Sequence, residues 1–452
     1  MIVQRPHVIR PSLALAVLLA GCATYRPKPL SDNPALLSPP VMAAVARDAA
    51  TIERPFLRPA AIDLAQPLDP NAIATLAVLL NPDLRALRER AGVADAQAFA
   101  AGLLPDPSFS LGADQVLSGP DTFLGLAASL GLNLAALRTR GVARAQANAE
   151  ARRVRLDLAW AEWQTSGQAR IQAARIVALE RAEILARAAR DDAQSILDRM
   201  LRAAGRGDIL PDQVQAARIA AFDAADRLRT TERDLATAQS ELRRLIGLPP
   251  GFPLRLASMT LAAPSLDAAA LFDIAVRQRA DLQALRAGYA AQEAAVHKAV
   301  LDQFPTLELS INGARDTGGN TTLGPSVAFT LPLWNRNRGG IAIERATRAA
   351  LRAEYEARLF RTRAEIAAAV ESLRILGRQR AAILRDLPAL ERFATANRRA
   401  AERGDLALAT AITAGQALRD KQILLAQAER DIAEQMIALE LLTGAPQEAW
   451  TQ

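Results

Sequence analysis

Short segments in which apolar and polar residues alternate occur twice along the chain, each time as a pair joined by a polar, Gly-containing turn. In the second pair the apolar positions recur at every second residue: Leu307, Leu309, Ile311, Val327, Phe329, Leu331 and Leu333. About ten residues in each direction, at roughly 3.3 Å per residue, are enough to cross a bilayer. The alternation therefore predicts two membrane β-hairpins, over about 107–134 and about 305–333.

Each hairpin is followed by a long stretch with helical periodicity, about Arg138–Ala204 in one case and Arg338–Arg403 in the other. A helix of roughly 65 residues is about 100 Å long. A shorter helix is predicted before the first hairpin, over Asn71–Leu104 with a kink at Asn81-Pro82. Another follows each long helix. In these return helices apolar residues fall seven apart, at Val214, Ala221, Leu228, Leu235 and Leu242 and at Ala411, Leu418, Leu425, Ile432 and Leu439. Such a repeat predicts a seam with a partner helix and a left-handed supercoil.

The same order of segments returns at an offset of about 197 to 199 residues, so the chain contains an internal duplication. Arg206-Gly207-Asp208, for example, returns as Arg403-Gly404-Asp405. We therefore predict a mainly α-helical protein with membrane β-structure. Its expected parts are a signal peptide (1–21), an extended N-terminal strap (22–70), a first repeat (71–247), a linker (248–266), a second repeat (267–444) and a tail (445–452).

The N-terminus has the features of a bacterial secretory signal. Basic residues precede an apolar run that is too short to span a membrane, and Leu19-Ala20-Gly21-Cys22 follows. This tetrapeptide resembles the lipobox, in which the cysteine is acylated and becomes the mature N-terminus. Cys22 is the only cysteine of the chain, which favours a lipid anchor over a chance cysteine after an ordinary signal sequence. Ala23 rather than Asp at the next position favours delivery to the outer membrane, by the same resemblance.

Composition and charge narrow the class of protein. Half of the residues are hydrophobic but only 4% are aromatic, as in long packed helices. The net charge of +7 is compatible with nucleic-acid binding. The arginines, however, lie along helices beside acidic residues three or four positions away, which is typical of a solvated helix surface. No nucleic-acid partner is predicted.

Catalytic and metal-binding residues are sparse. The two histidines are His7, in the signal peptide, and His297, alone on a predicted helix, and the five methionines are scattered. No metal site, phosphate loop or nucleophile–base set can be assembled from the sequence. Asp191-Asp192 is most simply part of a solvated helix face. We predict no enzyme activity and no cofactor.

Four strands cannot close a barrel, and an open sheet edge in lipid leaves backbone groups unpaired. The barrel must therefore be shared between chains. Two chains would supply eight strands, with an interior filled by side chains, and three would supply twelve strands around a lumen. The Leu/Phe face, with Leu309, Phe329 and Leu331, is expected to meet lipid, and the Ser/Thr/Asn/Glu face to line water.

The lipobox, duplication, hairpins, long helices and Gly-Asp breaks together resemble the TolC family of outer-membrane efflux factors. The resemblance covers essentially all of the mature chain. It implies a homotrimer with a twelve-stranded β-barrel above a twelve-helix periplasmic α-barrel. Leu331–Gly339 further resembles the strand-to-helix junction of the heavy-metal (cobalt–zinc–cadmium) branch, which is associated with resistance–nodulation–division pumps. The counterpart in the first repeat, Leu134–Arg138, departs from that pattern.

The resemblance also implies where partners bind. In the family, the turns after the long helices form the periplasmic tip and contact a periplasmic adaptor. By motif match that role passes to Arg206, Gly207, Asp208, Arg403, Gly404 and Asp405. The implied function is a passive exit duct for drugs or heavy-metal cations, energised by an inner-membrane pump. The sequence leaves two alternatives open: a duct for type I protein secretion, and a periplasmic coiled-coil adaptor lipoprotein.

Overall fold

The computed structural model describes residues 25–120, 123–257 and 267–450, and it divides into two units, residues 1–38 and 39–452. In the first unit, the described residues contain one short 3-10 helix, η1 (Ala35–Leu37). The predicted signal peptide and the predicted lipid anchor Cys22 lie outside the described residues. All other elements belong to the second unit.

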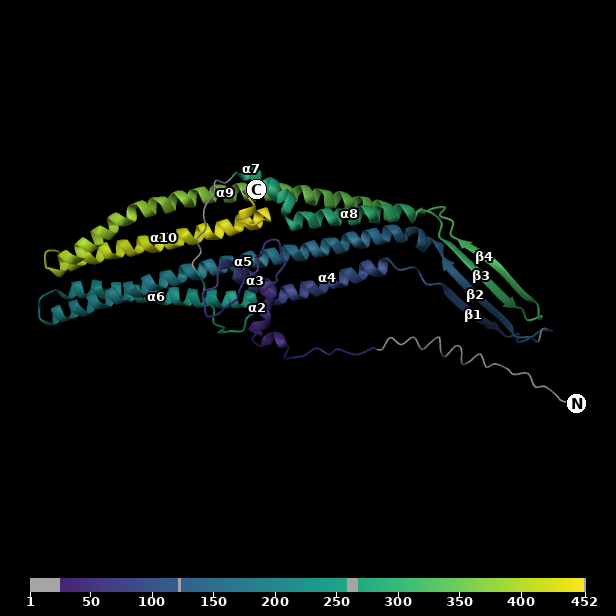
Figure 1. Cartoon of the computed structure of the whole chain (residues 1–452), viewed down its shortest axis with the longest axis horizontal. Helices are drawn as coiled ribbons and strands as arrows, with labels where there is room; N and C mark the ends of the chain where they lie inside the picture. The colour runs from purple at the N-terminus through teal and green to yellow at the C-terminus, as the bar shows by residue number, and fades with distance from the viewer. Residues whose placement is uncertain (1–24, 121–122, 258–266, 451–452) are drawn as a thin grey trace. The chain divides into compact units, whose positions relative to one another are not determined.

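The second unit repeats one order of elements: two short helices, two strands, a long helix and a return helix (Figure 1). After α2 (Met42–Ala50), the first repeat comprises α3 (Pro70–Leu80), α4 (Pro82–Ala101), β1 (Ser108–Asp114), β2 (Gly125–Asn133), α5 (Leu134–Gly205) and α6 (Pro211–Ile246). The second comprises α7 (Ala268–Gln278), α8 (Ala280–Leu301), β3 (Leu307–Arg315), β4 (Thr321–Phe329), α9 (Arg338–Glu402) and α10 (Leu408–Thr443), followed by η2 (Gln447–Ala449). The predicted duplicated architecture is therefore confirmed.

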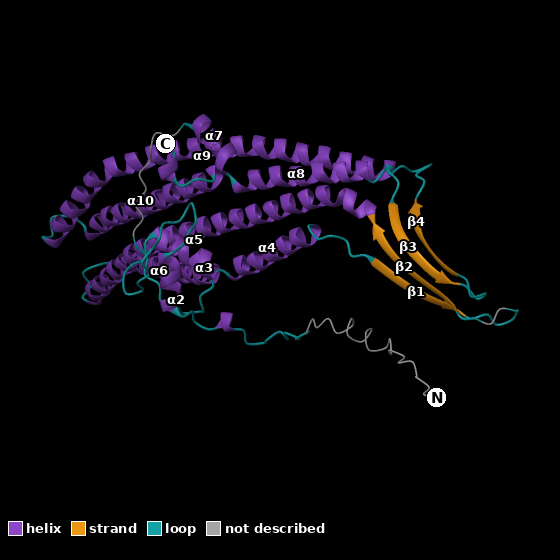
Figure 2. Ribbon diagram, turned by 45° about the vertical axis from the view of Figure 1, so that its right-hand side comes forward, coloured by secondary structure: helices purple, strands orange, loops and turns teal. Residues whose placement is uncertain are grey.

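Helix α5 is the centre of the helical region. It packs against α4 and α8 along the part near the strands and against α6 and α10 along the other part. Helix α9 packs against α8 and α10. The four strands lie together at one end of the second unit, where α5 and α9 begin (Figure 2). At about 1.5 Å per residue, the 72 residues of α5 span roughly 108 Å.

The break between α3 and α4 allows α4 and α6 to follow each other along α5. The Asn81 side chain accepts a hydrogen bond from the N–H of Leu84 at 2.8 Å and donates one to the carbonyl of Leu245 at 2.7 Å. It thereby caps α4 and ties it to the end of α6. Gly247, which ends α6 with a φ of +89°, lies against the carbonyl of Leu80, where a Cβ would clash. The shorter helices α4 and α6 are therefore arranged end to end along α5.

The predicted seven-residue ladders form the seams of the two helical hairpins. All five residues of the first ladder are buried, in the contact between α6 and α5. In the second ladder Leu425 and Leu439 are buried and the other three residues are half-buried. Apolar side chains repeated at this spacing keep one stripe of each return helix against its long partner.

Two predicted boundaries are wrong. Helix α5 begins at Leu134 rather than Arg138, because Asn133 caps it by accepting a hydrogen bond from the N–H of Ala136 at 3.0 Å. Strand β4 ends at Phe329, so Leu331 and Leu333 lie beyond it. Pro332 has no N–H to donate to a sheet ladder, which ends the strand there. Leu331 is exposed, but it is not a strand residue.

The predicted extended strap (22–70) also differs from the structure. Residues 42–50 form helix α2, whose Val45 is buried in a core cluster with Ile73 and Leu76 of α3. Val45 and Ala49 lie one helical turn apart, so one face of α2 can be covered by α3. The Pro-rich composition of the surrounding residues obscured this short amphipathic stretch.

Candidate functional site

The four strands form one antiparallel sheet with two chemically distinct faces. The order is β1-β2-β3-β4, and directly paired residues lie on the same face. Leu130 pairs with Phe109 on one side and Ile311 on the other, and Ile311 pairs with Pro325. One residue along, Ser129 pairs with Ser110 and Asn312, and Asn312 pairs with Gly324. The register thus gives the sheet one apolar face and one face of small or polar residues, and both faces extend across all four strands.

Two of the three residues predicted to face lipid lie on the apolar face. Leu309 pairs with Leu132 and Val327, and Phe329 pairs with Leu307. Their exposures are 40% and 59%, so a large part of each residue is left uncovered by the described chain. At the far end of this face the guanidinium of Arg315 lies 5.1 Å from the ring centre of Phe123, an amphipathic pair at the rim of an otherwise apolar surface.

The edges of the sheet are free in the described chain. Strand β1 pairs only with β2 and β4 only with β3, so each has one row of backbone groups without a strand partner. Nine residues in β2, β3 and β4 give strands of about 30 Å at roughly 3.4 Å per residue. Among the described residues, no helix combines the length and the apolarity needed to cross a membrane.

The predicted tip residues form two equivalent turns at the end of the helices away from the strands (Figure 1). Gly207 and Gly404 have φ values of +79° and +84°, which favour glycine. In the first turn the N–H of Asp208 donates to the carbonyl of Ala203 at 2.9 Å, and in the second the N–H of Asp405 donates to Ala400 at 2.9 Å. Both turns thus end their helix with a Schellman motif.

The charged tip residues pair within their own turns. Arg206 Nε contacts Asp208 Oδ2 at 2.8 Å, and Arg403 Nε contacts Asp405 Oδ2 at 2.8 Å. The structure therefore does not bring the two turns of one chain together through these residues. All four side chains are more than half exposed, so they remain accessible to a partner.

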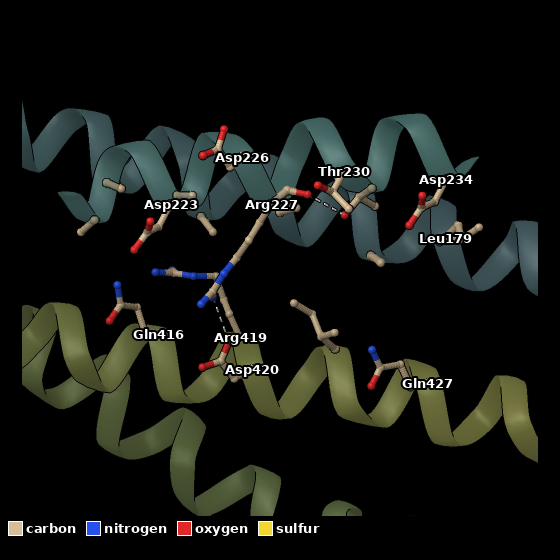
Figure 3. Close-up of a pocket in the computed structure, with 18 of the residues that line it drawn as sticks. Leu179, Asp223, Asp226, Arg227, Thr230, Asp234, Gln416, Arg419, Asp420 and Gln427 are labelled. Carbon is tan, nitrogen blue, oxygen red and sulfur yellow. Dashed lines mark hydrogen bonds and ion pairs between the residues drawn. The ribbon is translucent and has the colours of Figure 1, made fainter. Parts of the chain in front are cut away.

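The two helical hairpins are instead bridged across a groove of about 1140 Å³ between α6 and α10 (Figure 3). Arg419 of α10 contacts Asp192 of α5 at 2.7 Å, and Arg227 of α6 points across the groove to Asp420 of α10, with a distance of 3.9 Å. Asp192 is therefore an interhelical partner rather than simply part of a solvated face. Sequence reasoning missed these residues because ion pairs between distant helices leave no local pattern.

Buried ion pairs join the two repeats and the N-terminal segment near the middle of α5. Glu162 is 2% exposed and contacts Arg54 at 2.6 Å and Arg88 at 2.7 Å. The hydrogen bonds that Arg54 donates to the Glu162 carboxylate raise the pKa of Arg54. Glu440 of α10 contacts Arg170 of α5 at 2.5 Å. Each buried carboxylate thus has a cationic partner, and removing that partner would leave an uncompensated buried charge.

Some carboxylates have pKa values that are raised by burial. Burial raises the pKa of Asp157, which the nearby Arg153 partly offsets, and it raises the pKa of Glu434 against the effect of Arg430. In the described part of the chain, no three His, Cys, Asp or Glu side chains gather in a way that could hold a metal ion. His297 is exposed on α8.

Comparisons with known proteins point to one class. Residues 271–445 match the outer membrane efflux protein family. No match was found among curated proteins. The fold is similar to the outer membrane protein VceC from Vibrio cholerae, with a TM-score of 0.71 and 18% identity over 83% of this chain and 96% of that one.

Two further solved structures share the fold. The Campylobacter jejuni CmeC outer membrane channel has a TM-score of 0.72 and 15% identity, over 83% of this chain and 85% of that one. The open state of the Neisseria gonorrhoeae MtrE outer membrane channel has a TM-score of 0.63 and 17% identity, over 82% and 88%.

The fold is that of outer-membrane channels, and the match to the outer membrane efflux protein family covers α7 to α10. The family match and the shared fold support the resemblance to outer-membrane efflux factors. These similarities favour a channel over the alternative of a periplasmic coiled-coil adaptor.

Proposed function

We propose that three copies of this chain form a passive exit duct through the outer membrane. The observation that carries this proposal is that the sheet and the helical layer end at matching edges. At one edge lie β1, α4 and α6, and at the other lie β4 and α9. Joining β4 of one chain to β1 of the next would satisfy both rows of free backbone groups, and three chains would give twelve strands around a lumen.

The duct would export substrates that an inner-membrane pump delivers through a periplasmic adaptor. The exposed turns around Gly207 and Gly404 would contact the adaptor, since they lie farthest from the strands. We favour a pump of the resistance–nodulation–division type and export of drugs or heavy-metal cations, because Leu331–Gly339 resembles the junction of the heavy-metal branch. Type I protein secretion is the competing assignment.

Opposite faces of β3 provide the sharpest test of the membrane assignment. Leu309→Arg would place a cation in lipid, at a cost of about 2–4 kcal/mol if the residue lies near the midplane. The matched control Ser310→Arg changes the next residue, on the polar face. We expect Leu309→Arg to reduce the amount of trimer in outer membranes, and Ser310→Arg to leave it unchanged while altering conductance. Equal tolerance of both changes would contradict the proposal.

The adaptor contact can be tested at the turns. Replacing both Gly207 and Gly404 with bulky residues should abolish export. Each glycine has a positive φ, which disfavours any other residue, and no atom of the described chain beyond the adjoining residues lies within 4 Å of the position that a Cβ would take. Trimer and sheet should persist. If the double variant shows export and adaptor crosslinking at wild-type levels, the turns only end their helices and do not contact the adaptor.

A lipid on Cys22 would add a second attachment to the membrane. Cys22→Ser should therefore remove incorporation of labelled fatty acid while the trimer stays in the membrane through its strands. Equal labelling of the variant and the parent would exclude this anchor.

A further inference from the structure

Charged residues are rare in the sheet and are divided unequally between its faces. Across the four strands the charged side chains are Asp114, Glu308 and Arg315. The register places Asp114 opposite Gly125 and Glu308 opposite Asn133 and Ala328, all on the polar face. Arg315 lies on the apolar face beside Phe123. The polar face of the strands therefore carries acidic residues and no basic one.

Glu308 is not neutralised by any contact in the described chain. It is exposed, and it makes no ion pair or hydrogen bond with a described residue. One basic side chain near this end of β3 is Arg138. Its guanidinium donates to the carbonyls of Leu301 and Pro305 at 3.1 Å each and lies over the Phe304 ring. Arg138 thus caps the end of α8 and forms no ion pair with Glu308.

We propose that Glu308, assisted by Asp114, makes the lumen of the β-barrel selective for cations. This inference rests on the proposed three-chain duct, in which each chain would contribute both carboxylates around one lumen. Asp114 lies at the far end of β1 and Glu308 near the helices, so a solute would pass acidic side chains at both ends of the sheet. Rings of Asp or Glu favour the passage of cations in other channels. The fitting substrate class is cationic, despite the net charge of +7 for the whole chain.

The first experiment measures the reversal potential of the purified full-length protein in planar bilayers under a KCl gradient. The wild type should favour K⁺ over Cl⁻. Glu308→Gln should lower the permeability ratio by roughly twofold or more, and Glu308→Lys should invert it. The control Arg315→Gln removes a charge from the opposite face and should leave the ratio unchanged. The difference in permeability ratio between the wild type and Glu308→Gln should shrink at 1 M salt, where the Debye length is about 3 Å.

The reversal potential reports on the whole duct, including its helical part. A thiol probe placed in the sheet reports on the barrel alone. Ser326 lies on the polar face, opposite Ser310. In a Ser326→Cys chain, a cationic thiol reagent should react faster than an anionic one of equal size, and adding Glu308→Gln should reduce that preference. A chain without the introduced cysteine gives the background rate.

The two proposals fail in different ways. If trimers conduct but Glu308→Gln changes neither the permeability ratio nor the thiol preference, the selectivity assignment is overturned and the duct stands. If the wild-type chain forms no trimer and no conducting pore, the duct itself is wrong, and the inference falls with it.

Discussion

The long helices α5 and α9 occupy the same place in the two repeats, yet α5 buries two faces and α9 only one. The face toward the short helices is buried in both. Ala169, Ala173 and Ile176 of α5 are matched 197 residues later by Ile366, Val370 and Leu373 of α9. These equivalent residues form the core within each repeat.

The second face shows the difference. Trp163 is 4% exposed and Gly167 lies against Leu441 of the second repeat, where a Cβ would stand 2.5 Å from a Leu441 methyl group. The equivalent residues of α9 are Phe360, which is 77% exposed, and Ala364, which is also exposed. Duplication therefore made two similar helices, and only the first has the other repeat of the same chain beside it. In the proposed trimer, the exposed face of α9 meets the next chain.

The largest expected effect concerns the buried carboxylate Glu162 of α5, whose equivalent in α9 is Leu359. Glu162→Ala would leave Arg54 and Arg88 without their buried partner and should lower the free energy of unfolding by about 3–5 kcal/mol. As a control, Glu371→Ala on α9 breaks an exposed contact with Arg374 at 3.5 Å and should cost less than about 1 kcal/mol. Chemical denaturation of both variants measures the contrast. Similar losses would mean that the buried ion pairs of Glu162 contribute no more than an exposed pair on α9.

Added volume at equivalent positions separates the two helices further. Gly167→Leu should destabilise the folded chain by about 1–3 kcal/mol, because Leu441 occupies the space. Ala364→Leu lies on the exposed face and should change the folding of a single chain by no more than about 0.5 kcal/mol. Thermal unfolding of the two variants provides the measurement. A larger effect at Ala364 would reverse the comparison.

Phe360 tests whether the exposed face of α9 is an interface between chains. Burying a Phe side chain contributes about 1.5–3 kcal/mol, so Phe360→Glu should weaken the trimer while leaving the protomer folded. Phe360→Leu keeps an apolar side chain and should retain most of the association. Sedimentation of the detergent-solubilised protein measures the oligomeric state. If Phe360→Glu forms trimers as stable as those of the parent, this position of α9 is not part of an interface between chains.

The smallest effect concerns pH. Glu434 of α10 has a raised pKa because burial disfavours its charged form, whereas the equivalent residue of α6 is Thr237. A raised folded-state pKa means that the charge opposes folding at neutral pH and that this penalty disappears as pH falls through that pKa towards the ordinary 4.5. Glu434→Gln should therefore stabilise the chain at pH 7 by about 0.5 kcal/mol or less after solvent screening. The gain should vanish near pH 4.5. A gain that grows as the pH falls would contradict the sign.

The sequence by itself determined the elements and their duplication. The period-two runs predicted both hairpins and both faces of the sheet, and the seven-residue ladders predicted the helical seams, because side chains at a regular spacing meet one environment whatever the rest of the chain does. The Gly-Asp breaks likewise marked the turns at Gly207 and Gly404, since a positive φ is a local requirement.

Only the tertiary structure decided which contacts join these elements. Glu162 meets Arg54 from 108 positions away and Asp192 meets Arg419 from 227 positions away. Neither pair has a periodic signal. The tertiary structure also decided that Trp163 is buried and Phe360 exposed, although both are aromatic residues at equivalent positions of similar helices. The physical reason is that burial depends on which neighbour covers a face, and a residue's own sequence surroundings do not specify that neighbour.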